Sequence, residues 1–579
     1  MKLRPVSSRA LTTKGPIMRA HQRIAPVVVA LLLLLVPVLP SLAQPVPETR
    51  LYIGHRARLT ADIPAGWTID PNLHHAYRGP DGVVFSGAFP ADTLSGACDE
   101  AATLFEGTAI DTTWSGEPAC EMDGTFQDET FHALVVPHPT PFMLLDQRMA
   151  FAFIATDPEH FESITATLSF DPARVTPQEY LGSVIDIVEA MAWWGEGIDW
   201  EFTREYMLAS VEGLETIESI HGSLLNLVSL LRGAGDNHSG VLLPDQANAL
   251  QENSGFGMYL GGDRVIAVFP DGPAAHAGLQ TGDVIETVNG ESTPPGNGLD
   301  PALAWNASQT LWRTPAMLIV SREGLAELFT VTLEVDTYEF YLPPTGLALA
   351  GGIGYIDIPL YRIPGREAEF ASTASDIIAE IDQSPTCGWI VDLRLNLGGN
   401  YAPMVSGVGP LLGEGTFSGW AWRNGTQNWL EYQDGVIFED GQEVSNYFAP
   451  TGPYALQHPN PPVAVLTSNY TGSSGEVTAL AFTARPDTRF FGERTGGYTT
   501  GNRGFFLFDG SVLSLATTAM TDRNGETYLQ GIPPDEVVEI DWATHGTADD
   551  PVLIAAQEWL ASQPACAGAT PVASPIPGD

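Results

Sequence analysis

The chain has 579 residues, which is more than one hydrophobic core can organise, and this length predicts three or four domains. Its formal net charge is −44, with 70 Asp and Glu residues against 26 Lys and Arg residues. Because phosphate recognition requires a basic surface, this charge excludes nucleic acid as a partner.

The N-terminus has the pattern of an export signal. Six basic side chains precede an apolar run at residues 25–42, and the small residues Ser41 and Ala43 stand just before Gln44. We therefore predict that residues 1–43 are a cleaved signal peptide. A retained membrane anchor is the alternative, but three prolines and the small-residue site favour cleavage. We expect a secreted, periplasmic or cell-surface protein that meets a membrane only through an uncleaved signal segment.

The chain has only two lysines, Lys2 and Lys14, and both precede the predicted cleavage site. The mature protein would therefore contain no lysine. This excludes a lysine general base, a Schiff base and a P-loop lysine.

Four cysteines in an exported protein predict two disulfides. The spacing favours a pair of Cys98 with Cys120 inside one small domain. It also favours Cys387 with Cys566, which would connect a core strand to the C-terminal end. The sequence alone does not fix this connectivity.

The first half of the mature chain divides into two predicted regions. Residues 44–172 alternate short apolar stretches with Gly, Pro and Asp turns, as in GVVFSGAFPAD, and this predicts a β-rich N-terminal domain whose role no motif indicates. Residues 173–250 change to a helical period, as in EYLGSVIDIVEAMAWW, and predict a helical cap. The cap ends in a polar turn that contains one histidine, His238.

Residues 251–340 combine predicted strands with the helix-forming segment PAAHAGL. The motifs GPAA, AGL, GDVI and VNG, at residues 272–275, 277–279, 282–285 and 288–290, resemble a PDZ domain. Such a domain binds the end of an extended chain and holds its carboxylate on backbone N–H groups. The resemblance places this peptide-binding loop at Gly255, Phe256 and Gly257. A PDZ domain that serves only packing or regulation is the alternative.

Strands and helices alternate from residue 341 to residue 562, and this pattern predicts an α/β core. The last predicted element, DPVLIAAQEWLAS, is an amphipathic helix. Residues 563–579 form a Pro-, Ala- and Ser-rich tail that we expect to be disordered.

Six motifs of the cap and core occur in a fixed order: DNHS at 236–239, DLRLNLGGN at 392–400, TGSSGE at 471–476, GERTG at 492–496, GIPPD at 531–535 and DPVL at 550–553. With a PDZ-like region between the first two, they resemble the carboxyl-terminal processing and tricorn-like serine peptidases, the tail-specific proteases of peptidase family S41. The resemblance covers roughly residues 175–562. It implies a multidomain α/β protein with a ClpP/crotonase-like catalytic core.

The resemblance assigns the nucleophile to Ser473, in a turn between a buried strand and a helix. Such a turn offers free N–H groups and the positive end of a helix. The N–H of Ser474 and that of Gly398, with Gly399 adjacent, would form the oxyanion hole.

One branch of the family uses a serine and lysine pair, but Tyr498 occupies the position of that lysine here. The chain is therefore similar to the histidine-dependent branch, whose base maps onto His238. The group that orients His238 stays open among Asp236, Glu526 and Gln530, because no acid stands at the expected offset before GIPPD.

The resemblance implies a secreted serine endopeptidase that cleaves unfolded or C-terminally recognised polypeptides and uses no metal or other cofactor. One alternative is an α/β-hydrolase with Ser473 in the nucleophile elbow and His545 as base, although Thr471 replaces the first glycine of that motif. Another is a weak or inactive family member that binds a peptide or an apolar ligand. Tyr498 and the missing acid motivate this second alternative.

Overall fold

The computed structural model describes residues 49–567, with gaps at residues 74, 145–146, 252–253, 262, 293–314, 340, 385, 449–451 and 543. The chain separates into a unit at residues 1–47 and a compact unit at residues 48–579. The predicted signal peptide lies outside the described residues, as does the tail beyond residue 567. No helix within the described ranges is long and apolar enough to cross a membrane.

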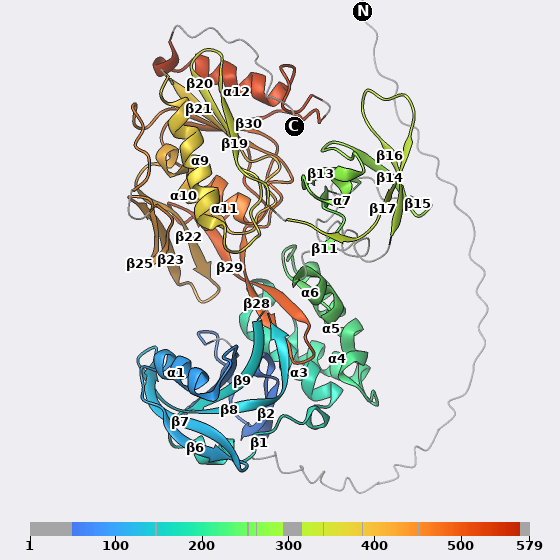
Figure 1. Cartoon of the computed structure of the whole chain (residues 1–579), viewed down its shortest axis with the longest axis vertical. Coiled ribbons are helices and arrows are strands. Elements are labelled where there is room, and N and C mark those ends of the chain that lie inside the picture. The colour runs from blue at the N-terminus through green and yellow to red at the C-terminus, as the bar shows by residue number, and fades with distance from the viewer. Residues whose placement is uncertain are drawn as a thin grey trace, which may run out of the picture. The chain divides into compact units, whose positions relative to one another are not determined.

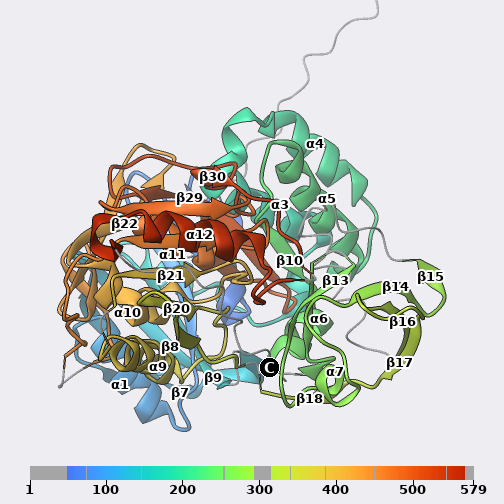
Figure 2. The same ribbon diagram turned by 90° about the horizontal axis from the view of Figure 1, so that it is seen from above.

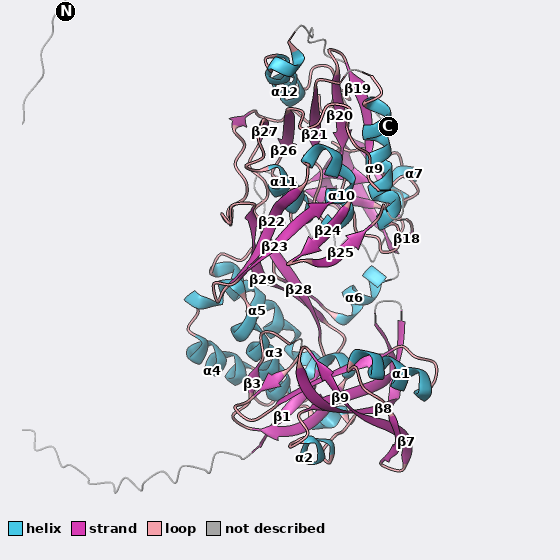
Figure 3. Ribbon diagram, turned by 90° about the vertical axis from the view of Figure 1, so that its left-hand side faces the viewer, coloured by secondary structure: helices cyan, strands magenta, loops and turns pink. Residues whose placement is uncertain are grey.

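The N-terminal region is β-rich, as its alternating pattern predicts. A hairpin of β1 (Thr49–Gly54) and β2 (Leu59–Pro64) precedes a seven-stranded sheet with the order β3-β4-β5-β9-β8-β7-β6. The bounds of these strands are β3 Thr68–Ile69, β4 Tyr77–Arg78, β5 Val83–Phe89, β6 Ile110–Trp114, β7 Glu117–Phe126, β8 Glu129–Leu144 and β9 Gln147–Thr156. Helix α1 (Leu94–Leu104) covers one face of the sheet (Figure 3), and Cys98 on this helix is bonded to Cys120 on β7.

Side chains alternate between two cores along the strands of this sheet. On β8, Ala133 and Val135 pack with α1, whereas Leu134 and Val136 belong to a second core shared with the helical cap. The period of two along a strand explains why neighbouring residues serve different cores.

The helical cap is formed by α3 (Pro177–Met191), α4 (Trp200–Ser210) and α5 (His221–Gly233), after a short α2 (Phe161–Thr165). Helix α3 begins with a capping box, because the hydroxyl of Thr176 accepts from Glu179 N and the Glu179 carboxylate accepts from Thr176 N. After α5 the chain turns at residues 235–239 and enters β10 (Gly240–Leu242), followed by α6 (Pro244–Gln251).

The next region is a mainly antiparallel sheet of β12 (Met258–Gly261), β13 (Arg264–Val268), β14 (Val284–Val288), β16 (Ala316–Ser321) and β17 (Phe329–Leu333). Strand β15 (Glu291–Ser292) pairs with β14, and β11 (Ser254–Gly255) pairs with β18 (Asp336–Thr337). A single turn of helix, α7 (Pro273–His276), packs on this sheet through Ala274.

The C-terminal region contains a mostly parallel sheet with the order β19-β20-β21-β26-β27-β30. Its strands are β19 Thr345–Leu349, β20 Ile353–Asp357, β21 Gly388–Asp392, β26 Val463–Thr467, β27 Thr488–Gly492 and β30 Glu536–Val537. Figure 2 shows its helices: α9 (Glu367–Ile381), α10 (Tyr401–Leu412) and α11 (Ser474–Phe482) share one core with the sheet, and α12 (Pro551–Ala561) shares another. The alternation along β26 sets this division, since Val463 and Val465 enter the first core and Ala464 and Leu466 the second.

Another sheet contains strands of both the cap region and the C-terminal region. Its strand order is β10-β29-β22-β23-β24-β25, and β28 pairs with β29. Its further bounds are β22 Gly415–Trp422, β23 Gln427–Gln433, β24 Val436–Glu439, β25 Gln442–Asn446, β28 Thr500–Phe506 and β29 Val512–Asp522. Strands β28 and β29 form a long hairpin (Figure 1). Strand β10 joins this sheet directly after His238, so the cap and the α/β core meet at the histidine.

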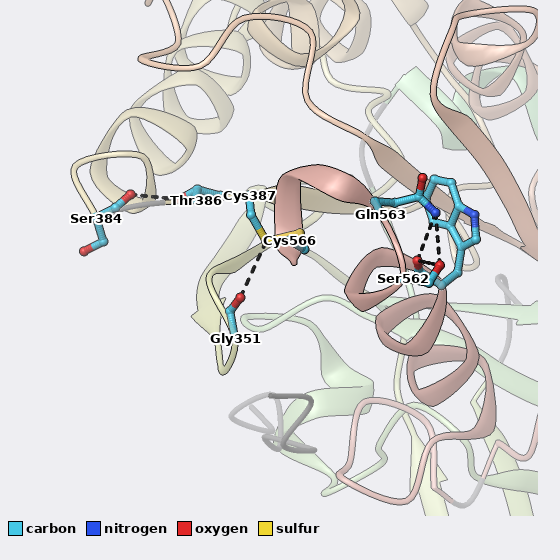
Figure 4. Close-up of a disulfide and its surroundings, with 8 residues drawn as sticks. Gly351, Ser384, Thr386, Cys387, Ser562, Gln563 and Cys566 are labelled. Atoms are coloured by element: carbon cyan, nitrogen blue, oxygen red, sulfur yellow. Dashed lines mark hydrogen bonds between the residues drawn. A yellow bond between two sulfur atoms is a disulfide. The ribbon is translucent and has the colours of Figure 1, made fainter. Parts of the chain in front are cut away.

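Cys387, before β21, is bonded to Cys566, beyond α12 (Figure 4). Both disulfides thus have the pairing that the spacing favours. Within the segment predicted to be a disordered tail, Pro564–Cys566 form a short 3-10 helix and Cys566 is buried. The described chain is a multidomain α/β protein.

Candidate active site

The candidate nucleophile, Ser473, lies at the end of the turn between β26 and α11. Ser473 is the N-cap of α11 and has φ 51° and ψ −118°, outside the regions that L-residues prefer. Strain of this kind collects at functional sites, where the surrounding structure holds the residue in place. Ser473 is half-buried, whereas Ser474 is buried and its hydroxyl donates to the Gly399 carbonyl at 2.6 Å. Of the two serines, Ser473 is the one that a substrate can reach.

A loop after β21 lies directly against this serine. A Cβ added to Gly398 would fall 2.7 Å from the Ser473 Cβ, and one added to Gly399 would fall 1.7 Å from the Tyr361 carbonyl oxygen. Both glycines have positive φ, 108° and 123°. Only glycine permits this approach of the loop to the nucleophile.

Two backbone N–H groups beside Ser473 are free to hold an oxyanion. The N–H of Gly398, which the sequence favours as a donor, is committed to Asn396 Oδ1 at 2.9 Å. Neither Gly399 N nor Ser474 N finds an acceptor among the described residues. Ser474 is the first residue of α11, where N–H groups have no partner inside the helix. The pair that could stabilise an oxyanion is therefore Gly399 and Ser474.

The candidate base, His238, is half-buried in the turn before β10. Its Nδ1 lies 2.9 Å from the Thr500 Oγ1 on β28. Burial lowers the pKa of His238 from 6.5 to about 4, so the ring is neutral at neutral pH. If Nδ1 carries the proton and donates to Thr500, Nε2 keeps the lone pair that a general base needs.

The three orienting residues considered from the sequence do not contact the ring of His238. Asp236 accepts from the backbone N–H groups of His238 and Ser239 and from the Ser239 hydroxyl, so it shapes the turn. Glu526 and Gln530 are exposed, and neither side chain reaches His238 through any contact within the described residues. The side chain that contacts Nδ1 is that of Thr500 instead.

Tyr498 connects the two candidate catalytic residues. Its ring lies edge-to-face against His238, with centroids 5.2 Å apart. A Cβ on Gly472, next to Ser473, would lie 3.2 Å from Tyr498 Cδ2. Tyr498, which stands where the serine and lysine branch of the family has its lysine, thus packs between His238 and the turn that contains Ser473. No hydrogen bond joins Ser473 to the His238 ring, although both residues are described; hydrogen bonds of this kind often tighten only when substrate binds.

Glu476 contacts the backbone of the turn that contains Ser473. Its fully buried carboxylate accepts from Ser473 N at 3.0 Å, from the Thr495 hydroxyl at 2.5 Å and from Gly497 N at 2.8 Å. Burial raises the pKa of Glu476 to about 7 against the lowering effect of these donors. This carboxylate therefore joins two loops of the site, the one that contains Ser473 and the one that contains Thr495 and Gly497.

A buried ion cluster supports the glycine loop. Arg394 is fully buried and pairs with Asp392 at 2.6 Å and with Asp550, the N-cap of α12, at 2.8 Å. The Tyr355 hydroxyl completes the cluster by donating to Asp392. These contacts fix the start of the glycine loop.

His545, the base of the hydrolase alternative, lies elsewhere. Its ring stacks on Trp542, with centroids 5.3 Å apart, and Trp542 packs in the core beneath α12. Burial, with the nearby Arg394 charge, lowers the pKa of His545 to about 4. No contact in the described ranges connects it to Ser473, so this geometry does not provide the hydrolase pair.

The loop expected to bind peptide ends, at residues 255–257, places the side chain of Phe256 in the core of its own domain. Phe256 is fully buried, its carbonyl accepts from Ala274 N, and the Gly257 carbonyl accepts from Phe269 N. Gly255 pairs with Asp336. Only backbone N–H groups of this loop could therefore receive a carboxylate. Elsewhere, no group of three or more His, Cys, Asp or Glu residues in the described part of the chain could hold a metal ion.

Two regions of the chain match known protein families. Residues 352–538 match peptidase family S41, and residues 264–301 match the PDZ domain. The first match contains Ser473 and both glycines, but it does not reach His238.

Two relatives show similarity in sequence. The chain is 34% identical to the nisin-resistance protein of Lactococcus lactis over 198 residues, which cover 34% of this chain and 59% of that protein. It is 24% identical to a carboxy-terminal-processing protease of Bartonella bacilliformis over 332 residues, 55% of this chain and 69% of that protein. The chain thus spans little more than half of the first relative.

Among solved structures, the photosystem II D1 C-terminal processing protease aligns with 64% of this chain and 94% of its own, with a TM-score of 0.45 and 21% identity. A lipoprotein from Streptococcus agalactiae aligns with 67% of this chain and 97% of its own, with a TM-score of 0.42 and 20% identity.

Proposed function

Because residues 352–538 match peptidase family S41, we propose that the protein is an exported serine endopeptidase with Ser473 as nucleophile and His238 as base. Its substrates are unfolded polypeptides or polypeptides recognised at their C-termini. The observation that carries this proposal is the position of Ser473, half-buried and strained at a helix start, beside the two free N–H groups of Gly399 and Ser474.

The mechanism follows from these positions. The Ser473 hydroxyl attacks the peptide carbonyl, and His238 Nε2 takes its proton. The N–H groups of Gly399 and Ser474 stabilise the negative oxygen of the tetrahedral intermediate. His238 then gives the proton to the leaving amine, and water hydrolyses the acyl-enzyme by the same route. Thr500 keeps the ring in the tautomer that leaves Nε2 free.

The remaining parts fit the same function. We propose that residues 251–340 form a PDZ domain that recruits polypeptide ends, and that residues 341–562 are a ClpP/crotonase-like core. Export by the predicted signal peptide is supported by the two disulfides, because disulfides persist in oxidising compartments.

Cleavage of an unstructured peptide with a free carboxyl terminus tests the proposal. We expect the wild type to cleave it, and both Ser473→Ala and His238→Ala to lose at least a thousandfold in kcat. His545→Ala should stay within about threefold of the wild type, and a chelator should have no effect. Nisin belongs among the test substrates, because one relative is named for resistance to it. Equal background cleavage by the wild type and Ser473→Ala would instead support a protein that binds peptides without cleaving them.

A further inference from the structure

The β28–β29 hairpin has one end at the candidate base and the other in the helical cap. Thr500, which contacts His238 Nδ1, is the first residue of β28. The hairpin turns at residues 507–511, where Leu507 N donates to the Ser511 carbonyl. At roughly 3.3 Å per residue, the six steps from Thr500 to Phe506 place this tip about 20 Å from the ring.

At the tip, one carboxylate joins the hairpin to two helices of the cap. The Asp509 side chain is only 2% exposed. It accepts from the Tyr180 hydroxyl on α3 at 2.6 Å and pairs with His221 Nε2, at the start of α5, at 2.8 Å. Ser511 N and the Ser511 hydroxyl also donate to it. Asp509 is therefore the polar anchor of the hairpin tip on the cap.

The N-terminal region holds the same tip. Phe508 N donates to His55 Nδ1 at 3.2 Å, and His55 Nε2 lies 3.0 Å from the Ser183 hydroxyl on α3. Apolar side chains of the tip enter the core that the N-terminal region shares with the cap: Phe505, Leu507, Phe508, Leu513 and Leu515.

At its base, the hairpin provides the contacts of the turn that carries His238. Thr500 Oγ1 faces the ring, and Asn502 Nδ2 donates to the His238 carbonyl at 2.9 Å. The following strand β10 pairs with β29, and Ala516 N donates to the Ser239 hydroxyl. A shift of the hairpin would therefore move the histidine.

We infer that Asp509 is a positioning residue for His238, and that the N-terminal region with α3 and α5 braces the hairpin that holds the base. The inference rests on the proposed function, in which His238 is that base. The inference gives residues 49–172 a function, because they include His55 and part of the apolar core that contacts the tip of the hairpin.

The test compares Asp509→Ala and Asp509→Asn with a matched control, Asp382→Ala. Asp382 is also a buried aspartate that accepts from a tyrosine hydroxyl, Tyr454, but it lies at the end of α9. Peptidase kinetics and amide hydrogen exchange of residues 236–242 are measured on the full chain. We expect Asp509→Ala to lower kcat at least tenfold with KM within twofold, and to speed the exchange at least tenfold. Asp509→Asn keeps an acceptor for Tyr180, so its kcat and exchange rate should lie between those of the wild type and Asp509→Ala. Asp382→Ala should change neither kcat nor the exchange rate beyond twofold.

Exchange at residues 236–242 within twofold of the wild type in Asp509→Ala would overturn the inference, as would an equal effect of Asp382→Ala. If Asp509→Ala does not fold, Tyr180→Phe and His221→Ala remove the donors singly, and the same exchange criterion applies to them. A wild-type protein without turnover would refute the proposed function alone, because the exchange comparison still decides whether the tip controls the turn.

Discussion

At the scale of single residues, the side chain that contacts the His238 ring nitrogen is a hydroxyl and not a carboxylate. Thr500 Oγ1 lies 2.9 Å from Nδ1, and no acid contacts the ring within the described residues. A neutral hydroxyl can fix the tautomer of this half-buried imidazole, whose pKa burial lowers to about 4.

Removing this hydroxyl should weaken the base without abolishing it. One hydrogen bond contributes about 0.5–1.5 kcal/mol, so we expect Thr500→Ala to lower kcat roughly two- to tenfold. Thr500→Ser keeps the hydroxyl and should stay near the wild type. Glu526→Ala and Gln530→Ala serve as controls. A larger loss in either control than in Thr500→Ala would return the orienting role to that residue.

Glu476 should make stability depend on pH in a defined direction. Its folded pKa, about 7, lies above the ordinary 4.5, so between these values the folded chain holds a proton that the unfolded chain has released. The stabilisation is fully present below pH 4.5 and is lost as the pH rises through 7. Relative to Glu476→Gln, the wild-type free energy of unfolding should fall by on the order of 3 kcal/mol from pH 4.5 to pH 8. Urea unfolding of both proteins measures this, and a constant difference would contradict it.

The motifs of the sequence pointed to Ser473 and His238 as candidates, but not to the groups that surround them in the structure. Thr500 is 262 residues from His238, and no motif marks it. Gly398 and Gly399 look equivalent in the sequence, yet the Asn396 side chain occupies one N–H and leaves the other free. Which donor is free depends on a side-chain rotamer in the folded loop, and local patterns do not encode that.

At the scale of elements, α12 is fixed to β21 at both ends. Asp550 at its start pairs with Arg394 just after the strand, and Cys566 beyond its end is bonded to Cys387 just before it. Alternating strand-like and helix-like segments predicted the α/β core, an amphipathic pattern predicted this helix, and the cysteine spacing favoured the disulfide. The ion pair was not foreseen, because Asp550 appeared only as part of a motif.

The two disulfides should differ in their contribution to stability. Cys387 and Cys566 are 179 residues apart, and Cys98 and Cys120 are 22 apart. Chain entropy alone gives about 5 kcal/mol for the longer loop and about 3 kcal/mol for the shorter one. Calorimetry should therefore show a larger loss of thermal stability in the Cys387→Ser, Cys566→Ser double variant than in Cys98→Ser, Cys120→Ser. The reverse order would show that the two pairs do not act through loop closure.

At the scale of the whole molecule, the net charge of −44 should influence which polypeptides bind. An acidic surface attracts basic chains, and salt screens this attraction beyond about 10 Å at 0.1 M ionic strength. We expect KM for an arginine-rich peptide to rise severalfold between 0.05 and 0.5 M salt, while KM for a matched neutral peptide changes less than twofold. Equal salt dependence for both peptides would mean that the surface charge serves only solubility.

The mechanism depends on the proposal that Ser473 is a nucleophile activated by His238. Labelling with a serine-directed phosphonate followed by peptide mapping tests it most directly, because the reagent records both the identity and the reactivity of the serine. We expect a label on Ser473 in the wild type, a label on the same serine in His545→Ala, and labelling slowed at least a hundredfold in His238→Ala. A label on another serine, or labelling of Ser473 at the wild-type rate without His238, would contradict it.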